Sequence, residues 1–237
     1  MLDVEKNTGM DVIILSGEYV IGGSQNRAVA SSVCLENGYK GTLPVRGVEH
    51  HRWNYDAPRE FSLGGHSPSM IRSSVNNQNT VWGEVTRTLT STGSVCESSN
   101  LHKAYTNRAN DLDSLLKHFP YEQDGAGVIA AIGMNEKTRF VLDFFADKYQ
   151  MERHYAAILR ARALEALQYN DDNLNLRPGE ISGFFRTALA NTNIGESFRL
   201  SKGCHTELTT RDGSKTGSVL IVNESPVYIT VACTLQL

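Results

Sequence analysis

The hydrophobic period of the chain changes twice along its length. Short alternating apolar runs dominate the first and last parts, whereas residues 148–168 repeat with the period of a helix. Short β-rich runs separated by glycine or asparagine are typical of antiparallel strands. The sequence therefore predicts an α+β fold with a mostly antiparallel β-sheet core and a helical middle section.

These periods also predict individual elements. We expect strands at residues 12–15, 28–35, 42–48, 126–132 and 140–145, helices at residues 81–89, 110–119, 148–168 and 180–190, and renewed strand alternation from Phe198 onward. Residues 133–136 contain a glycine and an asparagine, which favour a hairpin turn. Residues 170–173 are expected to end the longest helix.

Length and charge limit the possible functions. The chain has 237 residues, 40% of them hydrophobic, and no linker-like stretch, so we expect a single domain over residues 1–237. It carries 23 basic and 26 acidic residues, a formal net charge of −3. This balance argues against a long nucleic acid as partner, while a few local arginines suffice for a small anionic ligand.

The cysteines and the N-terminus indicate the compartment. Cys34, Cys96, Cys204 and Cys233 are widely separated and form no Cys-x-x-Cys pair, which argues against a zinc ribbon or a redox motif. The first residues resemble neither a signal region nor a membrane-spanning run. We therefore expect free thiols, a cytoplasmic location, no membrane contact and no resident metal or cofactor.

Two polar segments, residues 17–27 and 49–53, lie beside apolar strand-like sequence near the start of the chain. One interpretation is a polar recognition site, because buried charges and unpaired amides cost several kcal/mol in a protein that needs only to fold. The other is an ordinary hairpin corner, in which Gln25 and Asn26 bond the local backbone and Arg27 pairs with Glu18 or Glu49. The sequence leaves both open.

The order of several motifs resembles a known family. Gly17-Glu18, Gln25-Asn26-Arg27, Glu49 with Arg52-Trp53, and Val81-Trp82-Gly83-Glu84-Val85 follow one another as in the ADP-ribosylglycohydrolase and rhodanese-phosphatase associated protein domain family. Gly125-Ala126-Gly127 and Asp143-Phe144-Phe145 continue that order, so the resemblance spans most of the chain. It implies a link to NAD and ADP-ribose metabolism and a ligand with adenine, ribose and pyrophosphate groups.

The chain departs from that family in two respects. The family commonly has extra strands ahead of the Gly-Glu motif, and it commonly has a cysteine where this chain has Gly47. We therefore expect a shortened N-terminus, an open sheet edge and a homo-oligomer that covers the edge. The glycine argues against a shared cysteine nucleophile.

Nucleotide chemistry suits the side chains of these motifs. The candidate ligand-binding residues are Glu18, Gln25, Asn26, Arg27, Glu49, His51, Arg52, Trp53 and Trp82. Arg27 and Arg52 each offer a bidentate fork to phosphate. Gln25 and Asn26 both donate and accept, as an adenine edge requires, and a tryptophan supplies a stacking face. Together with what the resemblance implies, this predicts a protein that binds and sequesters a small nucleotide, linear or cyclic, derived from NAD or ADP-ribose.

Two alternatives remain. The first is a hydrolase or transferase of an ADP-ribosyl bond, in which Glu18 and Glu49 act as general acid and base and His50 or His51 shuttles protons. A metal site at His50, His51 and His66, with Glu49 nearby, is disfavoured if this segment is extended, because adjacent residues of a strand point to opposite faces. The second is a structural or partner-binding module whose polar cluster is an ion-pair network.

Arginines outside the motifs receive a simpler interpretation. Arg46 and Arg72 are expected to be surface charges, and contact with a phosphate is the alternative.

Overall fold

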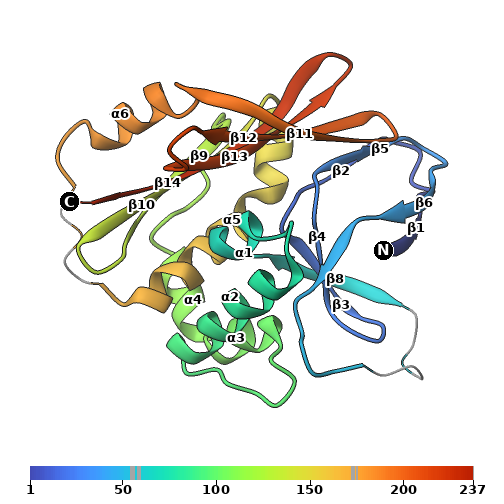
Figure 1. The fold of residues 1–237 in the computed structure, drawn as a ribbon, viewed down its shortest axis with the longest axis horizontal. Helices are drawn as coiled ribbons and strands as arrows, with labels where there is room; N and C mark the ends of the chain where they lie inside the picture. The colour runs from blue at the N-terminus through green and yellow to red at the C-terminus, as the bar shows by residue number, and fades with distance from the viewer. Residues whose placement is uncertain (54–56, 58–59, 172–173, 175, 237) are drawn as a thin grey trace.

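The computed structural model describes residues 1–53, 57, 60–171, 174 and 176–236. It confirms the predicted α+β class with mostly antiparallel sheet (Figure 1). In chain order the elements are β1 (Leu2–Glu5), β2 (Val12–Ile14), β3 (Glu18–Gly22), β4 (Arg27–Val29), β5 (Val33–Leu35), β6 (Lys40–Leu43), β7 (Val45–Gly47), β8 (Phe61–His66), α1 (Ser69–Ser73), α2 (Gln78–Ser91), α3 (Leu101–Asn107), α4 (Ala109–Leu116), β9 (Gly127–Gly133), β10 (Lys137–Phe145), α5 (Lys148–Tyr169), α6 (Glu180–Thr187), β11 (Thr192–Leu200), β12 (Gly203–Thr210), β13 (Lys215–Val222) and β14 (Ser225–Gln236).

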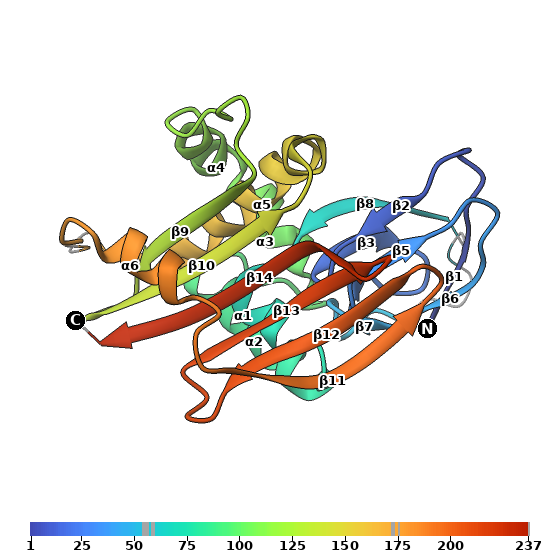
Figure 2. The same cartoon turned by 90° about the horizontal axis from the view of Figure 1, so that it is seen from above.

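The largest layer is a six-stranded antiparallel sheet in the order β11-β12-β13-β14-β10-β9 (Figure 2). Helix α5 packs on its inner face, where Met151 and Ile158 join Phe145 in one apolar cluster. Helix α6 covers part of the outer face, where Phe184 stacks on Phe140 with 5.2 Å between the ring centroids. The sheet is thus a layer between two helical elements.

Smaller sheets from the first part of the chain lie beside this layer (Figure 1). They are the four-stranded sheet β7-β4-β3-β8 and the pairs β1-β6 and β2-β5. Strand β5 reaches the large sheet, because Cys34 forms a bridge with Ser201 and its carbonyl accepts a hydrogen bond from Lys202 N at 3.1 Å. The first part of the chain therefore contacts the large sheet through β5.

Local sequence explains the ends of helix α5. The Asp147 side chain accepts a hydrogen bond from Tyr149 N at 2.9 Å, which satisfies a free N–H of the first turn. Asn170 ends the helix with φ = 46°, a left-handed conformation that asparagine tolerates. The predicted helix at 148–168 is confirmed, whereas Asp172 and Asn173, also expected at its end, lie outside the described residues.

The predicted hairpin is also confirmed. Strands β9 and β10 pair in antiparallel register around residues 134–136. Asn135 and Glu136 have φ angles of 50° and 68°, and Met134 N donates to Lys137 O at 2.8 Å. Consecutive positive φ angles match the right-handed twist of the flanking strands.

Two predicted strands are wrong as single elements. The run 28–35 divides into β4 and β5, because the chain leaves the sheet at Ser32, whose backbone N–H donates to His205 Nδ1. The run 42–48 divides into β6 and β7 at Pro44, which has no N–H to donate. A further strand, β1, precedes the first motif and pairs with β6.

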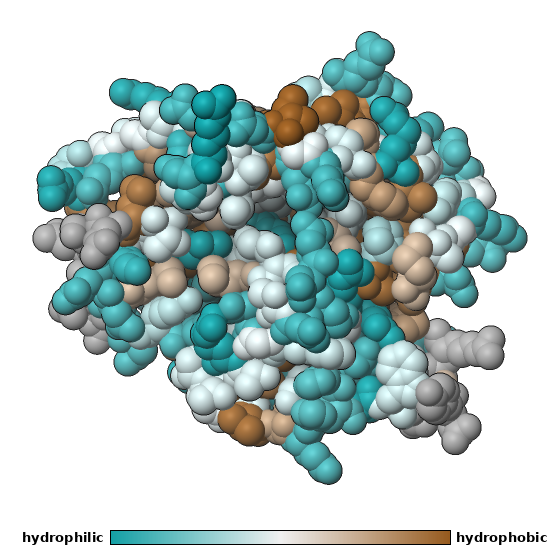
Figure 3. Space-filling view, in the orientation of Figure 1, coloured by the Kyte–Doolittle hydropathy of each residue, from teal (hydrophilic) through white to brown (hydrophobic). Residues whose placement is uncertain are grey.

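Figure 3 shows that polar side chains cover most of the face seen in Figure 1, with small separate apolar patches.

Candidate functional site

The inner face of the large sheet carries a row of polar side chains. Strand register places Glu207 opposite Ser218, Ser218 opposite Thr230, and Thr230 opposite Asp143. Directly paired residues project their side chains from the same face of a sheet. Four strands thus align four polar groups on a face that otherwise packs against α5.

Asp143 is the fully buried end of this row. Arg72 of α1 donates from Nη1 to its Oδ1 at 2.6 Å, and Arg162 of α5 donates from Nη2 to its Oδ2 at 3.0 Å. The Tyr228 hydroxyl donates to Oδ1 at 2.6 Å. Burial alone would raise the pKa of Asp143, but the two guanidinium groups outweigh it and hold that pKa well below its usual range.

A second carboxylate extends the buried network. Glu165 accepts hydrogen bonds from Ser69 N at 3.0 Å and from Arg162 Nη1 at 3.4 Å, and Arg139 Nε lies 3.5 Å from it. The charged members of the network are Arg72, Arg139, Arg162, Asp143 and Glu165, all buried. The network contains one more guanidinium than carboxylate, so it carries an excess positive charge. Uncompensated buried charge is costly, which makes the network a place where an anion is stabilised.

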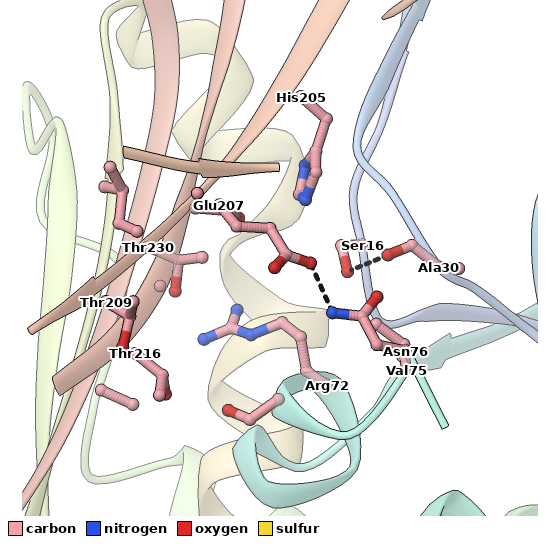
Figure 4. A pocket seen from close by; sticks show the side chains of 16 residues that line it. Ser16, Ala30, Arg72, Val75, Asn76, His205, Glu207, Thr209, Thr216 and Thr230 are labelled. Atoms are coloured by element: carbon pink, nitrogen blue, oxygen red, sulfur yellow. Dashed lines mark hydrogen bonds between the residues drawn. The ribbon is translucent and has the colours of Figure 1, made fainter. Parts of the chain in front are cut away.

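A cavity of about 340 Å³ adjoins this network (Figure 4). Its walls come from α1, from the segments around Ser16 and Ala30, and from β12, β13 and β14. Figure 4 shows the Arg72 guanidinium extending into the space between Glu207 and Thr216. Arg72 uses Nη1 for Asp143 and Tyr228, and its Nε and Nη2 donate to no partner among the described residues. These N–H groups are available to a ligand.

Thr230 is a second residue that indicates a ligand site at this cavity. Its side chain is 4% exposed and lines the cavity. Its hydroxyl has no hydrogen-bond partner among the described residues. Buried polar groups usually have a partner, so an unpartnered hydroxyl on a residue that lines the cavity indicates a group that a ligand or water completes.

His205 and Glu207 form the opposite wall. His205 Nδ1 accepts a hydrogen bond from Ser32 N at 3.1 Å, so in the neutral ring the proton is on Nε2. Burial lowers the pKa of His205 to about 4, and the ring is therefore neutral near pH 7. Glu207 Oε1 accepts a hydrogen bond from Asn76 Nδ2 at 2.5 Å (Figure 4). This wall offers one neutral donor and one carboxylate.

Four of the predicted ligand residues come together elsewhere, at the corner of the four-stranded sheet. Glu49 Oε2 accepts from Arg52 Nε at 2.8 Å and from Asn26 N at 3.3 Å. Asn26 Oδ1 accepts from Arg52 Nη2 at 3.0 Å, and Gln25 Nε2 donates to Glu49 O. Asn26 also donates to Asn100 Oδ1 at 3.0 Å. These groups bond one another, which favours the ion-pair interpretation of the corner.

Arg27, His51 and Trp53 lie at the outer side of that corner. Arg27 Cζ sits 5.2 Å from the ring centroid of Trp53, whose side chain is 51% exposed. A surface hollow of about 490 Å³ is lined by His51, Arg52 and Trp53 together with residues 96–98.

Trp82, His50 and His51 form a column of stacked rings. The ring centroids are 4.0 Å apart between Trp82 and His50, and 4.2 Å apart between His50 and His51. Residues 50–53 are not a strand, so the condition under which the two histidines would point to opposite faces is not met, and their rings stack on one side. In the described part of the chain, no group of three or more His, Cys, Asp or Glu side chains is arranged to hold a metal ion.

Glu18 lies away from Glu49. Its carboxylate is 2.9 Å from Nδ1 of His154 on α5. Strands β3 and β4 pair with Tyr19 opposite Ala28, so Glu18 lies near Val29 at the C-terminal end of β4. Glu49 contacts Asn26, which precedes the N-terminal end of β4. The structure does not bring the two carboxylates together.

A family model for the ARG and Rhodanese-Phosphatase-superfamily-associated Protein domain, ARPP-1, matches residues 1–232. The chain belongs to the ARPP-1 family. No curated protein and no solved structure matches it. The ARPP-1 description places the domain in the company of ADP-ribosylglycohydrolases and does not name a ligand.

The sequence did not predict the cavity of this ARPP-1 domain. Arg72, expected at the surface, is 6% exposed, and that prediction is wrong because its charge is compensated by Asp143 on a strand 71 residues away. One signal was present, since Asp143 interrupts an apolar run in β10. His205, Glu207 and Thr230 had no such signal, because strand pairing alone places them together.

The ARPP-1 domain has no membrane-crossing helix in its described part: none combines sufficient length with sufficient hydropathy.

Proposed function

We propose that this ARPP-1 domain binds a small anionic nucleotide derived from NAD or ADP-ribose, and that the Arg72 cavity holds its phosphate. The observation that carries the proposal is the Arg72 guanidinium, fixed by Asp143 through one nitrogen and free to donate into the cavity through the others. A guanidinium fork is well suited to phosphate oxygens. The excess positive charge of the buried network adds to the attraction.

The other walls support a sugar phosphate rather than an apolar ligand. Thr216, Ser218 and Thr230 are hydroxyl residues on two neighbouring strands that line the cavity, and Thr209 lines it from a third strand, with its hydroxyl bonded to backbone carbonyls. The volume lies within the lower part of the range for small-molecule sites. The family association with ADP-ribosylglycohydrolases supports a ligand of the ADP-ribose class.

Capture fits these observations better than hydrolysis through Glu18 and Glu49. Glu18 pairs with His154 and Glu49 pairs with Arg52, so each carboxylate is already engaged and neither lines the Arg72 cavity. We therefore infer that the domain retains its nucleotide unchanged, as a protein that sequesters a signal would.

Ligand-induced stabilisation tests this proposal. The purified domain is melted with ADP-ribose, AMP or inorganic phosphate, and the bound molecule is recovered after denaturation and weighed by mass spectrometry. A ligand at a hundred times its dissociation constant adds about 2.7 kcal/mol of stability. Stabilisation with recovery of intact nucleotide supports capture. Recovery of cleaved nucleotide supports catalysis, and no shift with any of the three probes overturns the proposal.

Self-association is a separate proposal. Strand β11 forms one edge of the six-stranded sheet, and its Ile194 is 79% exposed. Exposed edges of this kind are commonly covered by a second chain. Sedimentation equilibrium of the purified domain at micromolar concentration gives the mass directly, and a monomer mass contradicts a homo-oligomer.

A further inference from the structure

The Arg72 cavity has walls of opposite charge. Arg72 lies on one side and Glu207 on the other, and both line the same space (Figure 4). Within the described residues, the charged partner of Arg72 is Asp143, and no ion pair joins Arg72 to Glu207. A cation and an anion that share a cavity without meeting are suited to a ligand that is negative at one end and donates hydrogen bonds at the other.

The carboxylate of Glu207 is oriented by the protein and still has capacity to accept. Oε1 accepts from Asn76, which lies between α1 and α2, whereas Oε2 accepts from no described residue. A carboxylate repels phosphate, so the group that it meets in a bound nucleotide must be a donor. Hydroxyl groups are the donors that a nucleotide offers nearest to its phosphate.

His205 complements Glu207 on the same strand face. The two residues are separated by one position, so their side chains project in the same direction about 7 Å apart along β12. The bond from Ser32 N to Nδ1 leaves the Nε2–H of His205 as a donor. One residue accepts and the other donates, as two neighbouring hydroxyl groups require.

The spacing across the sheet fits a ribose between the two ends. Glu207 and Thr230 are two strands apart, a separation of about 10 Å. A phosphate bonded to Arg72 and Thr230 then leaves the adjoining sugar beside Ser218 and Glu207. The cavity therefore matches a ribose 5-phosphate unit in length and in polarity.

We propose that Glu207, with His205, binds the 2′,3′-diol of the ribose whose phosphate lies on Arg72. The proposal rests on the proposed function and adds its chemical selectivity: the cavity accepts ribonucleotides in preference to deoxyribonucleotides and to free phosphate. An acidic side chain performs the same task in dinucleotide sites, where it hydrogen-bonds a ribose hydroxyl.

Titration calorimetry with AMP, 2′-deoxy-AMP and inorganic phosphate tests the diol assignment. The parent protein is expected to bind AMP about ten-fold more tightly than 2′-deoxy-AMP, because one charge-assisted hydrogen bond is lost. Glu207→Gln is expected to weaken AMP about ten-fold and to remove the discrimination. It is not expected to weaken phosphate. The control Glu196→Gln alters an exposed glutamate on β11 that does not line the cavity, and it keeps the parent's preference.

The possible results separate the two proposals. Equal affinity of the parent for AMP and 2′-deoxy-AMP overturns the diol assignment and leaves nucleotide binding in place. Discrimination that persists in Glu207→Gln assigns the diol to other residues and also overturns it. The absence of binding by all three probes overturns the proposed function itself. The comparison of the two nucleotides uses the parent protein, so it stands even if the variant fails to fold.

Discussion

Nη1 of Arg72 lies 2.6 Å from Oδ1 of Asp143, and this buried pair joins the short helix α1 to strand β10. The same guanidinium reaches into the cavity beside β12–β14. One side chain thus links the stability of the fold to the chemistry of the candidate site.

Thr230→Val tests the cavity without breaking a contact. The Thr230 hydroxyl has no partner among the described residues, so its replacement by a methyl group of similar size leaves the free energy of unfolding unchanged or raises it by about 1 kcal/mol. The affinity for AMP is expected to fall roughly ten-fold if the hydroxyl bonds the ligand. Urea unfolding and titration calorimetry measure the two effects.

Thr138→Val is the matched control for this variant. Thr138 is also buried with an unpartnered hydroxyl, but it is not a cavity residue. Its replacement is expected to leave AMP affinity at the parent value. Equal loss of affinity in both variants contradicts a specific contact at Thr230.

Asp143→Ala tests the buried network. The change leaves Arg72 without a carboxylate partner and Arg162 with Glu165 alone, both in a buried environment, and it is expected to lower the free energy of unfolding by roughly 3 to 5 kcal/mol. Asp113→Ala removes the partner of Arg160 at the surface and is expected to cost less than about 1 kcal/mol. Similar losses in urea unfolding of the two variants would show that burial does not amplify the Asp143 interactions.

Acid destabilises the domain through its buried histidines. Burial lowers the pKa of His205 to about 4 and that of His66 to about 3, both below the ordinary value of 6.5. Between about pH 6.5 and pH 4 the unfolded chain therefore binds more protons than the folded chain, so the free energy of unfolding falls as the pH is lowered. Each histidine contributes at most about 1.4 kcal/mol per pH unit.

His205→Asn isolates one of these contributions. The asparagine amide retains an acceptor for Ser32 N near the position of Nδ1 but does not titrate. Urea unfolding from pH 7 to pH 4.5 is expected to give a shallower loss of stability in the variant than in the parent. Parallel curves would contradict a lowered pKa at His205.

The corner of the four-stranded sheet is expected to affect stability rather than affinity. Asn26→Ala leaves Arg52 and Gly22 N without one acceptor, and a loss of roughly 1 to 3 kcal/mol is expected in urea unfolding. Arg27→Ala removes a side chain over Trp53 and is expected to leave AMP affinity within two-fold of the parent, a difference of at most about 0.4 kcal/mol. Loss of AMP binding in Arg27→Ala with an intact fold would return the site to this corner.

Helix α5 and the β9–β10 hairpin were predictable because their signals are local. Apolar residues such as Met151 and Ile158 recur along α5 at helical spacing, and Asn135 favours the left-handed conformation that the turn requires. Strand register is not local. Glu207 and Asp143 share a row only because β12, β13, β14 and β10 pair in one particular alignment.

The corner of the four-stranded sheet and the Arg72 cavity also differ in how far the sequence predicts them. The proximity of Gln25, Asn26, Glu49 and Arg52 was anticipated from clustered motifs, yet the sequence left open whether they bond a ligand or one another. The structure joins them to one another. Arg72 stands next to serines in the sequence, which resembles a surface segment, and its burial depends on Asp143 far along the chain.

A crystal structure of the domain grown with AMP tests the central claim most directly. The account predicts electron density for the phosphate within about 3 Å of Arg72 Nε or Nη2 and of the Thr230 hydroxyl. Density for the nucleotide beside Arg27, Arg52 and Trp53, with the Arg72 cavity filled by water alone, would contradict it.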